Sequence, residues 1–237
     1  MVQEEKTSRY NRLYASGGFG YESQRAYWRE WVGRHHVSAF DLRPNEQVLD
    51  IPCGDGFWTS VLTELGFRAC GIDLSPKGVE VARERYPGIE FHVGDAEQDL
   101  PVEPGGSFDI VFSRGITHLH RPELITENST HMARNLMRYV RPGGLLLVCY
   151  YTKRDGGRQP RHAQHPVSEL VRLFETAGDP FKVEVVDDYV VIGVQHRESP
   201  RLQAYPNSVK LSARWHARGW LLRLQAGLRR RLRTRAR

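Results

Sequence analysis

The feature that most constrains the fold is a regular alternation of short apolar runs and amphipathic stretches between Gln47 and Val194. The apolar runs predict buried strands, and the stretches between them have the period of helices. Strands that are apolar almost throughout, in this order, are typical of a parallel sheet covered by helices on both faces. We expect strands at residues 47–51, 68–74, 90–93, 108–113, 145–151, 181–186 and 189–194, and helices at 57–65, 75–86, 126–140 and 167–177.

The end of this region has a different pattern. Only Asp187 and Asp188 separate the last two expected strands, so these strands must pair antiparallel. Upstream, residues 9–40 have a helical, aromatic pattern that the run Ser16-Gly17-Gly18-Phe19-Gly20 interrupts. The sequence therefore predicts an α/β fold with a seven-stranded, mostly parallel, doubly wound sheet that closes on an antiparallel C-terminal hairpin strand. We expect three parts: an N-terminal helical cap or lid (1–46), a ligand-binding domain (47–198) and a basic amphipathic tail (199–237).

The charge of the chain is unevenly distributed. Its 237 residues carry a formal net charge of +6, which by itself suggests a nucleic-acid or membrane partner. From Arg197 onward, however, there are 12 of the 34 Lys and Arg residues and one of the 28 acidic residues, so this segment carries +11 and the rest of the chain −5. A mildly acidic body argues against a nucleic-acid groove in the ligand-binding domain.

Other totals bear on location. No window approaches the roughly 20 apolar residues that a membrane span needs, and the polar N-terminus lacks the apolar stretch of a secretory signal. Three scattered cysteines are too few for a disulfide framework. We expect a cytoplasmic protein with reduced thiols.

The loop after the first expected strand contains two glycines suited to a ligand. It reads Asp50-Ile51-Pro52-Cys53-Gly54-Asp55-Gly56-Phe57. Gly54 and Gly56 allow the backbone to pass close to a ligand and to turn into a helix N-terminus. A dinucleotide fingerprint would have a third glycine where Thr59 stands, and no phosphate-binding loop is present. The pattern favours a nucleoside with an uncharged or cationic linker.

Acidic residues follow the next two expected strands. Asp73 precedes Leu74 at the end of the second strand, and a carboxylate there can accept both hydroxyls of a ribose. Asp95 precedes Ala96 at the end of the third, where a carboxylate and a backbone N–H can contact an adenine. The carboxyl ends of parallel strands meet at one edge of a sheet, so the three segments predict one nucleoside site.

With these segments in place, the sequence resembles the class I S-adenosylmethionine-dependent methyltransferases. The resemblance covers residues 48–194, and Pro52 departs from it by replacing a glycine that is frequent in the family. It implies that Asp73 binds the ribose, that Asp95 and the Ala96 amide bind the adenine, and that Gly54 lies beside the methionine moiety. The motifs are residues 48–56, 71–75, 94–96, 108–113 and 140–144, and the implied cofactor residues are Asp50, Gly54, Gly56, Asp73, Leu74, Asp95, Ala96 and Ser113.

The loop after the fourth expected strand is the candidate acceptor loop. A methyl transfer needs an aligned nucleophile and, for a hydroxyl acceptor, a base, which makes His118 our candidate catalytic base. The alternative is that His118 and His120 cap a helix or pack under the loop. A His118-x-His120 pair also has a spacing that binds metals, but no closed ligand set follows from it and we expect no metal. Arg114 either holds an anionic substrate or supports the loop.

These patterns predict methyl transfer to a small-molecule, sugar or lipid-linked acceptor, most simply at oxygen. The alternatives are a methyltransferase of RNA or another macromolecule that uses the basic tail, and a non-catalytic binding module. The Asn/Asp-Pro-Pro-aromatic run of amino-methylating DNA enzymes is missing after the fourth strand. Pro52-Cys53, which resembles a cytosine-methylating nucleophile, stands in the cofactor loop instead.

Two peripheral segments each allow more than one interpretation. Tyr14, Phe19 and Tyr21 either close on a sulfonium ion or form core. In the tail, leucines recur at helical spacing among arginines. Such a segment lies on an anionic membrane surface, extends into solvent or docks on the domain, with nucleic-acid binding less favoured. We therefore expect a cytoplasmic location that includes the membrane periphery; the leucines are Leu221, Leu224, Leu228 and Leu232.

Overall fold

A computed structural model describes residues 2–102, 107–151, 165–186 and 189–199, all of which belong to one unit, Met1–Arg201. The expectations for the basic tail lie outside the described residues. None of the described helices is long and apolar enough to cross a membrane.

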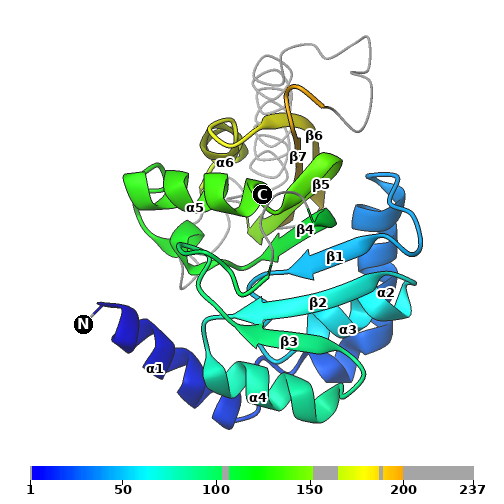
Figure 1. Cartoon of the computed structure of the whole chain (residues 1–237), viewed down its shortest axis with the longest axis vertical. Helices are drawn as coiled ribbons and strands as arrows, with labels where there is room; N and C mark the ends of the chain where they lie inside the picture. Colours follow the sequence, from blue (N-terminus) through cyan, green and yellow to red (C-terminus); the bar gives the residue numbers. More distant parts are fainter. Residues whose placement is uncertain (1, 103–106, 152–164, 187–188, 200–237) are drawn as a thin grey trace, which may run out of the picture. The chain divides into compact units, whose positions relative to one another are not determined.

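The described unit is built on one seven-stranded sheet in the order β3-β2-β1-β4-β5-β7-β6, which confirms the predicted fold class (Figure 1). The first five strands are parallel, and β7 pairs antiparallel with both β5 and β6. The chain therefore turns back at its last hairpin and inserts β7 next to β5. The strands are β1 Gln47–Asp50, β2 Arg68–Asp73, β3 Glu90–Val93, β4 Phe108–Arg114, β5 Val140–Tyr151, β6 Asp179–Val186 and β7 Tyr189–Gln195.

Alternate residues of the central strands enter two separate cores. Leu49 and Val111 pack with α5 (Glu127–Met137) and α6 (Val167–Phe174) on one face of the sheet. Val48 and Phe112 pack on the other face with α2 (Arg25–Val32) and α3 (Phe57–Glu64). Side chains alternate across a strand, so near-continuous apolar strands fill both cores at once.

Local signals start the helices that follow the ligand-binding strands. The Ser75 hydroxyl accepts the Gly78 N–H at 3.0 Å and caps α4 (Pro76–Arg85), whose first residue is proline. The Thr126 hydroxyl accepts the Ser129 N–H and begins α5. A fixed helix start also fixes the conformation of the loop before the helix, and these loops contain residues expected to bind the ligand.

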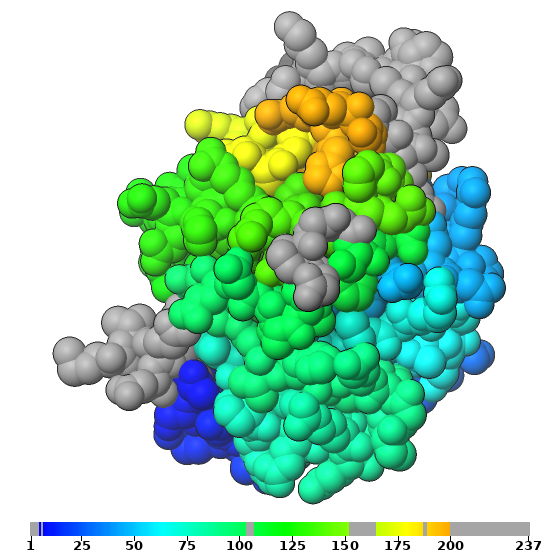
Figure 2. Space-filling model, in the orientation of Figure 1, coloured from blue at the N-terminus to red at the C-terminus, as the bar shows by residue number. Residues whose placement is uncertain are grey.

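The N-terminal segment folds as the sequence predicts, with a helix on each side of the glycine run. Helix α1 (Val2–Ala15) ends just before Ser16, and short turns η1 (Tyr21–Gln24) and η2 (Gly33–Ser38) flank α2. Figures 1 and 2 show α1, in blue, lying beside α4. The N-terminal helices therefore pack in two places: α2 covers one face of the sheet, and α1 lies against α4.

Four predicted element boundaries are wrong, among them the start of β5, which is Val140 rather than Leu145. The helix expected at 126–140 ends at Met137, because Val140 instead pairs with Phe108 and starts β5. The register shifts after this pair, so the Pro142-Gly143-Gly144 turn lies inside β5 as an irregularity. The helix expected at 167–177 ends at Phe174, and β6 starts at Asp179 rather than Phe181.

Candidate active site

The glycine loop after β1 has the left-handed backbone that the sequence predicts. Gly54 and Gly56 have φ angles of +58° and +80°, which disfavour a side chain at either position. A Cβ on Gly54 would lie 2.5 Å from the Tyr14 hydroxyl, whereas a Cβ on Gly56 would meet Phe91 at 2.8 Å. The lack of a side chain at Gly54 thus makes room for Tyr14 of α1. At Gly56 it makes room for Phe91 of β3.

The carboxylate of Asp73 organises this loop from the end of β2. One of its oxygens accepts the Gly54 N–H and the other accepts the Ser75 N–H, each at 2.8 Å. The side chain is buried, and burial raises the pKa of Asp73 to about 6, although both backbone donors oppose the change. Two predicted cofactor residues, Gly54 and Asp73, are therefore in direct contact.

Asp50, the last residue of β1, is a second buried carboxylate at this edge. Its Oδ2 accepts the Thr59 hydroxyl at 2.6 Å, and its Oδ1 has no hydrogen-bond partner among the described residues. Burial raises the pKa of Asp50 to about 7. On β4, the buried Ser113 hydroxyl likewise lacks a partner within the described part of the chain. Buried polar atoms without partners are costly, so these two mark positions suited to a polar ligand.

Helix α1 contributes Asn11, which the sequence analysis missed, and Tyr14, which the sequence left as either a lid over a sulfonium ion or core. Asn11 accepts the Ser75 hydroxyl at 2.6 Å, and one turn further on Tyr14 packs between Gly54 and Gly78. Tyr14 is only 6% exposed, and burial raises the pKa of its hydroxyl far above the ordinary value. A glycine inside helix α4, Gly78, leaves room for the Tyr14 ring. This glycine could have indicated close packing, but nothing in the sequence connects it to α1.

The loop after β3 places the predicted adenine residues. Asp95 Oδ1 accepts the Glu97 N–H at 3.0 Å, and the Ala96 carbonyl accepts the side-chain amide of Asn135 at 2.9 Å. Leu74, after β2, is half-buried. The loop is thus held to α5 by Asn135, a contact that no local sequence pattern predicts.

The acceptor loop brings His118 next to that same β3 loop. His118 lies in the turn η3 (Thr117–His120) and is buried, with its Nε2 in contact with Glu97 Oε1. His120 is hydrogen-bonded through Nδ1 to the Tyr150 hydroxyl at 2.8 Å, and Thr117 to the Tyr10 hydroxyl at 3.0 Å. The buried His118 therefore pairs with the half-buried Glu97, and Glu97 was missed although it stands two residues from Asp95.

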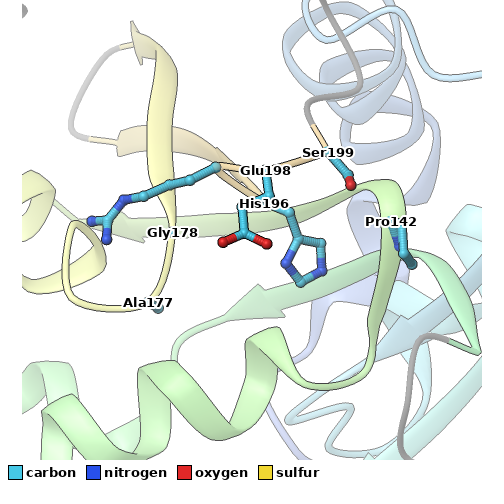
Figure 3. A pocket seen from close by; sticks show the side chains of 7 residues that line it. Pro142, Ala177, Gly178, His196, Glu198 and Ser199 are labelled. Carbon is cyan, nitrogen blue, oxygen red and sulfur yellow. The ribbon is translucent and has the colours of Figure 1, made fainter.

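Other candidate sites lie apart from this edge. A pocket of about 330 Å³ opens beside the start of β5 and the end of β7, at the opposite edge of the sheet (Figure 3). Among the described residues no group of three or more His, Cys, Asp or Glu side chains is placed to hold a metal. The pocket is lined by Pro142, Ala177, Gly178, His196, Arg197, Glu198 and Ser199.

This geometry defines a Rossmann-like domain with a nucleoside site at the carboxyl edge of its sheet. The family model described as a methyltransferase domain matches residues 48–144, which contain the glycine loop, Asp73 and Asp95. This match, together with the relatives described below, supports the class I S-adenosylmethionine-dependent methyltransferases as the family that the sequence motifs predicted.

Individual relatives agree with this assignment. A malonyl-[acyl-carrier protein] O-methyltransferase of Serratia marcescens is 33% identical over 129 residues, covering 54% of this chain and 46% of the relative. A probable S-adenosylmethionine-dependent methyltransferase of Mycolicibacterium smegmatis is 30% identical, covering 65% and 60%. The solved structure of human N-acetylserotonin methyltransferase with S-adenosylmethionine superposes with a TM-score of 0.57 at 19% identity, over 74% of this chain and 54% of that one. This chain spans less than two thirds of the length of each of these proteins.

The residues at the carboxyl edge fit the family's cofactor, S-adenosylmethionine. Asp73 presents a carboxylate beside the Gly54 backbone, and Asp50 Oδ1 and Ser113 Oγ lack partners in the described structure. Asp50 and Asp73 give this edge an acidic character that suits a ligand with a cationic sulfur and an ammonium group, whereas Asp55 is paired with Arg85 at 2.7 Å. The same carboxylates would repel the phosphates of a dinucleotide.

Proposed function

We propose that the protein transfers a methyl group from S-adenosylmethionine to an oxygen atom of a small-molecule, sugar or lipid-linked acceptor. The observation that carries this proposal is that the sheet edge formed by Asp73 and Gly54, which suits a nucleoside, lies near a buried His118 held by Glu97 on the neighbouring loops. The Serratia relative is named as an O-methyltransferase, which supports oxygen as the acceptor atom.

The part of the edge formed by β1 and β2 would hold the cofactor. When bound, S-adenosylmethionine supplies a methyl group activated by a positively charged sulfur. Asp73 would accept the ribose hydroxyls, because each carboxylate oxygen has a lone pair beyond the one used by a backbone N–H. Asp95 and Ala96 would contact the adenine, and Tyr14 would exclude water from above the Gly54 loop.

His118 would act as the base that removes the proton of an acceptor hydroxyl. Glu97 fixes the ring, and in the neutral tautomer that donates Nε2–H to Glu97, Nδ1 is the basic nitrogen. The carboxylate also stabilises the imidazolium that forms after proton transfer. The Glu97 contact brings the catalytic loop to the adenine loop, so cofactor binding and base positioning depend on the same backbone segment.

The test is release of S-adenosylhomocysteine from the full chain with S-adenosylmethionine and a panel of hydroxylated small molecules. His118→Gln is expected to lower turnover by roughly 100-fold with unchanged S-adenosylhomocysteine affinity. His92→Gln is the matched control, because His92 also pairs with a glutamate, Glu90 at 2.8 Å, but on the outer strand. Equal turnover of the two variants would remove His118 from the mechanism.

A further inference from the structure

Arg114, the last residue of β4, is enclosed by aromatic rings. Its guanidinium carbon lies 4.0 Å from the centre of the Trp58 ring and between 5.3 and 5.5 Å from the rings of Tyr21, Trp28 and Tyr189. Two of its nitrogens donate to hydroxyls, Nη1 to Tyr21 at 3.4 Å and Nη2 to Tyr189 at 3.2 Å. The cation is thus held by ring faces and phenol oxygens.

No carboxylate neutralises this cation in the described structure. Arg114 forms no ion pair with a described residue, and its buried Nε has no hydrogen-bond partner there. Asp50 is close enough to respond to its charge, but burial raises the pKa of Asp50 to about 7, so that carboxyl is partly protonated at neutral pH. A guanidinium is charged at every accessible pH, and a charge without a counter-ion is costly to bury.

Arg25 shows what an arginine with a purely structural role looks like in the same chain. Its guanidinium also stacks on rings, 5.0 Å from the centre of Phe57 and 5.6 Å from that of Tyr86. Unlike Arg114, it is paired with two carboxylates, Glu22 and Glu64, each at 2.6 Å. Stacking alone therefore accounts for the Trp58 contact of Arg114, but not for its unpaired Nε.

The three phenols around Arg114 add further hydrogen-bond donors. Tyr189 accepts from Arg114 and donates to the Tyr151 hydroxyl at 3.1 Å, while Tyr21 accepts from the other side of the guanidinium. All three side chains are half-buried, so ligand can approach them. We call Arg114, Tyr21, Tyr151 and Tyr189 the Arg114 cluster; it has an excess of donors, which suits an anion with several acceptor oxygens.

The position of the Arg114 cluster assigns it to the acceptor side. Arg114 ends β4, Tyr151 ends β5, and Tyr189 begins β7, which runs antiparallel to β5. All three therefore lie at the carboxyl edge, on the strands away from β2 and β3, where the predicted ribose and adenine residues stand. Resting on the function proposed above, we infer that the Arg114 cluster binds an anionic group, a carboxylate or phosphate, of the methyl acceptor.

The experiment is a titration of the full chain with inorganic phosphate and with acetate at constant ionic strength. Trp28 and Trp58 contact the guanidinium, so tryptophan fluorescence reports on the cluster. We expect saturable changes in the wild type, at least tenfold weaker binding in Arg114→Gln, and wild-type behaviour in Arg25→Gln. Arg114→Lys, which keeps the charge without the planar fork, is expected to weaken binding about fivefold and serves if the glutamine variant does not fold.

Binding of S-adenosylhomocysteine separates the possible outcomes. The methionine part of the cofactor also carries a carboxylate, so competition between phosphate and S-adenosylhomocysteine, with equal losses of both in Arg114→Gln, would overturn the assignment to the acceptor. Absence of any anion effect in a wild type that binds S-adenosylhomocysteine would overturn the inference alone. A wild type that does not bind S-adenosylhomocysteine would contradict the proposed function instead, whatever the anions do.

Discussion

The two halves of the sheet's carboxyl edge carry opposite charges. On β1 and β2, Asp50 and Asp73 are buried with no cation in contact among the described residues. On β4, Arg114 is enclosed by aromatic rings with no carboxylate in contact there. Asp50 lies on the strand next to that of Arg114 and Asp73 lies one strand further away, yet no ion pair joins Arg114 to either carboxyl group in the described structure. We interpret the acidic half as the cofactor side and the basic half as the acceptor side.

The largest predicted effect is the loss of folding stability that the buried Asp50 causes in the ligand-free protein as the pH rises. Burial raises the pKa of Asp50 from 3.8 to about 7, so the folded state holds a proton that the unfolded chain releases at lower pH. Its stabilising contribution is therefore complete below about pH 4 and is lost as the pH rises through 7. At about 1.4 kcal/mol per pKa unit, the shift from 3.8 to about 7 corresponds to a loss of the order of 4 kcal/mol.

Asp50→Asn removes this titration and keeps an acceptor for the Thr59 hydroxyl. Urea unfolding between pH 4 and 8 should show a clearly smaller decline in the free energy of unfolding for Asp50→Asn than for the wild type. Asp99→Asn, at a side chain that is 77% exposed, is the control and should follow the wild type. Identical pH profiles for all three proteins would mean that burial does not raise the pKa of Asp50.

The second effect separates backbone strain from steric collision at the cofactor loop. Gly54→Ala introduces strain at a positive φ angle and a Cβ 2.5 Å from the Tyr14 hydroxyl. Gly20→Ala introduces the same kind of strain at φ +70° with nothing within 4 Å. We expect Gly54→Ala to weaken S-adenosylhomocysteine binding roughly 30-fold, about 2 kcal/mol, relative to Gly20→Ala. Equal affinities would show that ligand binding does not depend on the close approach of Tyr14 to the Gly54 backbone.

The positions of the strands along the chain and the acidic residues near their ends were predictable from the sequence, because both depend on local patterns. Apolar runs mark the strands; Asp73 ends β2, and Gly54 and Asp95 stand in the loops after β1 and β3. The His118–Glu97 pair and the packing of Tyr14 against Gly54 were not predictable, because each joins segments far apart in the chain. For the aromatic residues upstream, the sequence favoured core over a lid on the cofactor. In the structure Trp28 and Trp31 are core, whereas Tyr14 covers the glycine loop.

The smallest effect tests whether α1 connects the two halves. Adjacent residues of α1 reach different sides: Tyr10 bonds Thr117 in the acceptor loop, and Asn11 bonds Ser75 beside Asp73. Tyr10→Phe should increase amide exchange at residues 115–120 and Asn11→Ala at residues 75–78, each by roughly the 1 kcal/mol of a hydrogen bond. Faster exchange of both segments in both variants would show that α1 opens as one unit rather than through separate contacts.

The central claim is that the acidic half binds the cofactor and the basic half does not. Calorimetric titration of the wild type, Asp73→Asn and Arg114→Gln with S-adenosylhomocysteine tests it directly. We predict that Asp73→Asn loses about 100-fold in affinity, or about 2.7 kcal/mol, because one acceptor oxygen becomes a donor facing the Gly54 N–H or the Ser75 N–H. Arg114→Gln should stay within about threefold of the wild type. Unchanged affinity in Asp73→Asn, or an equal loss in both variants, would contradict the account.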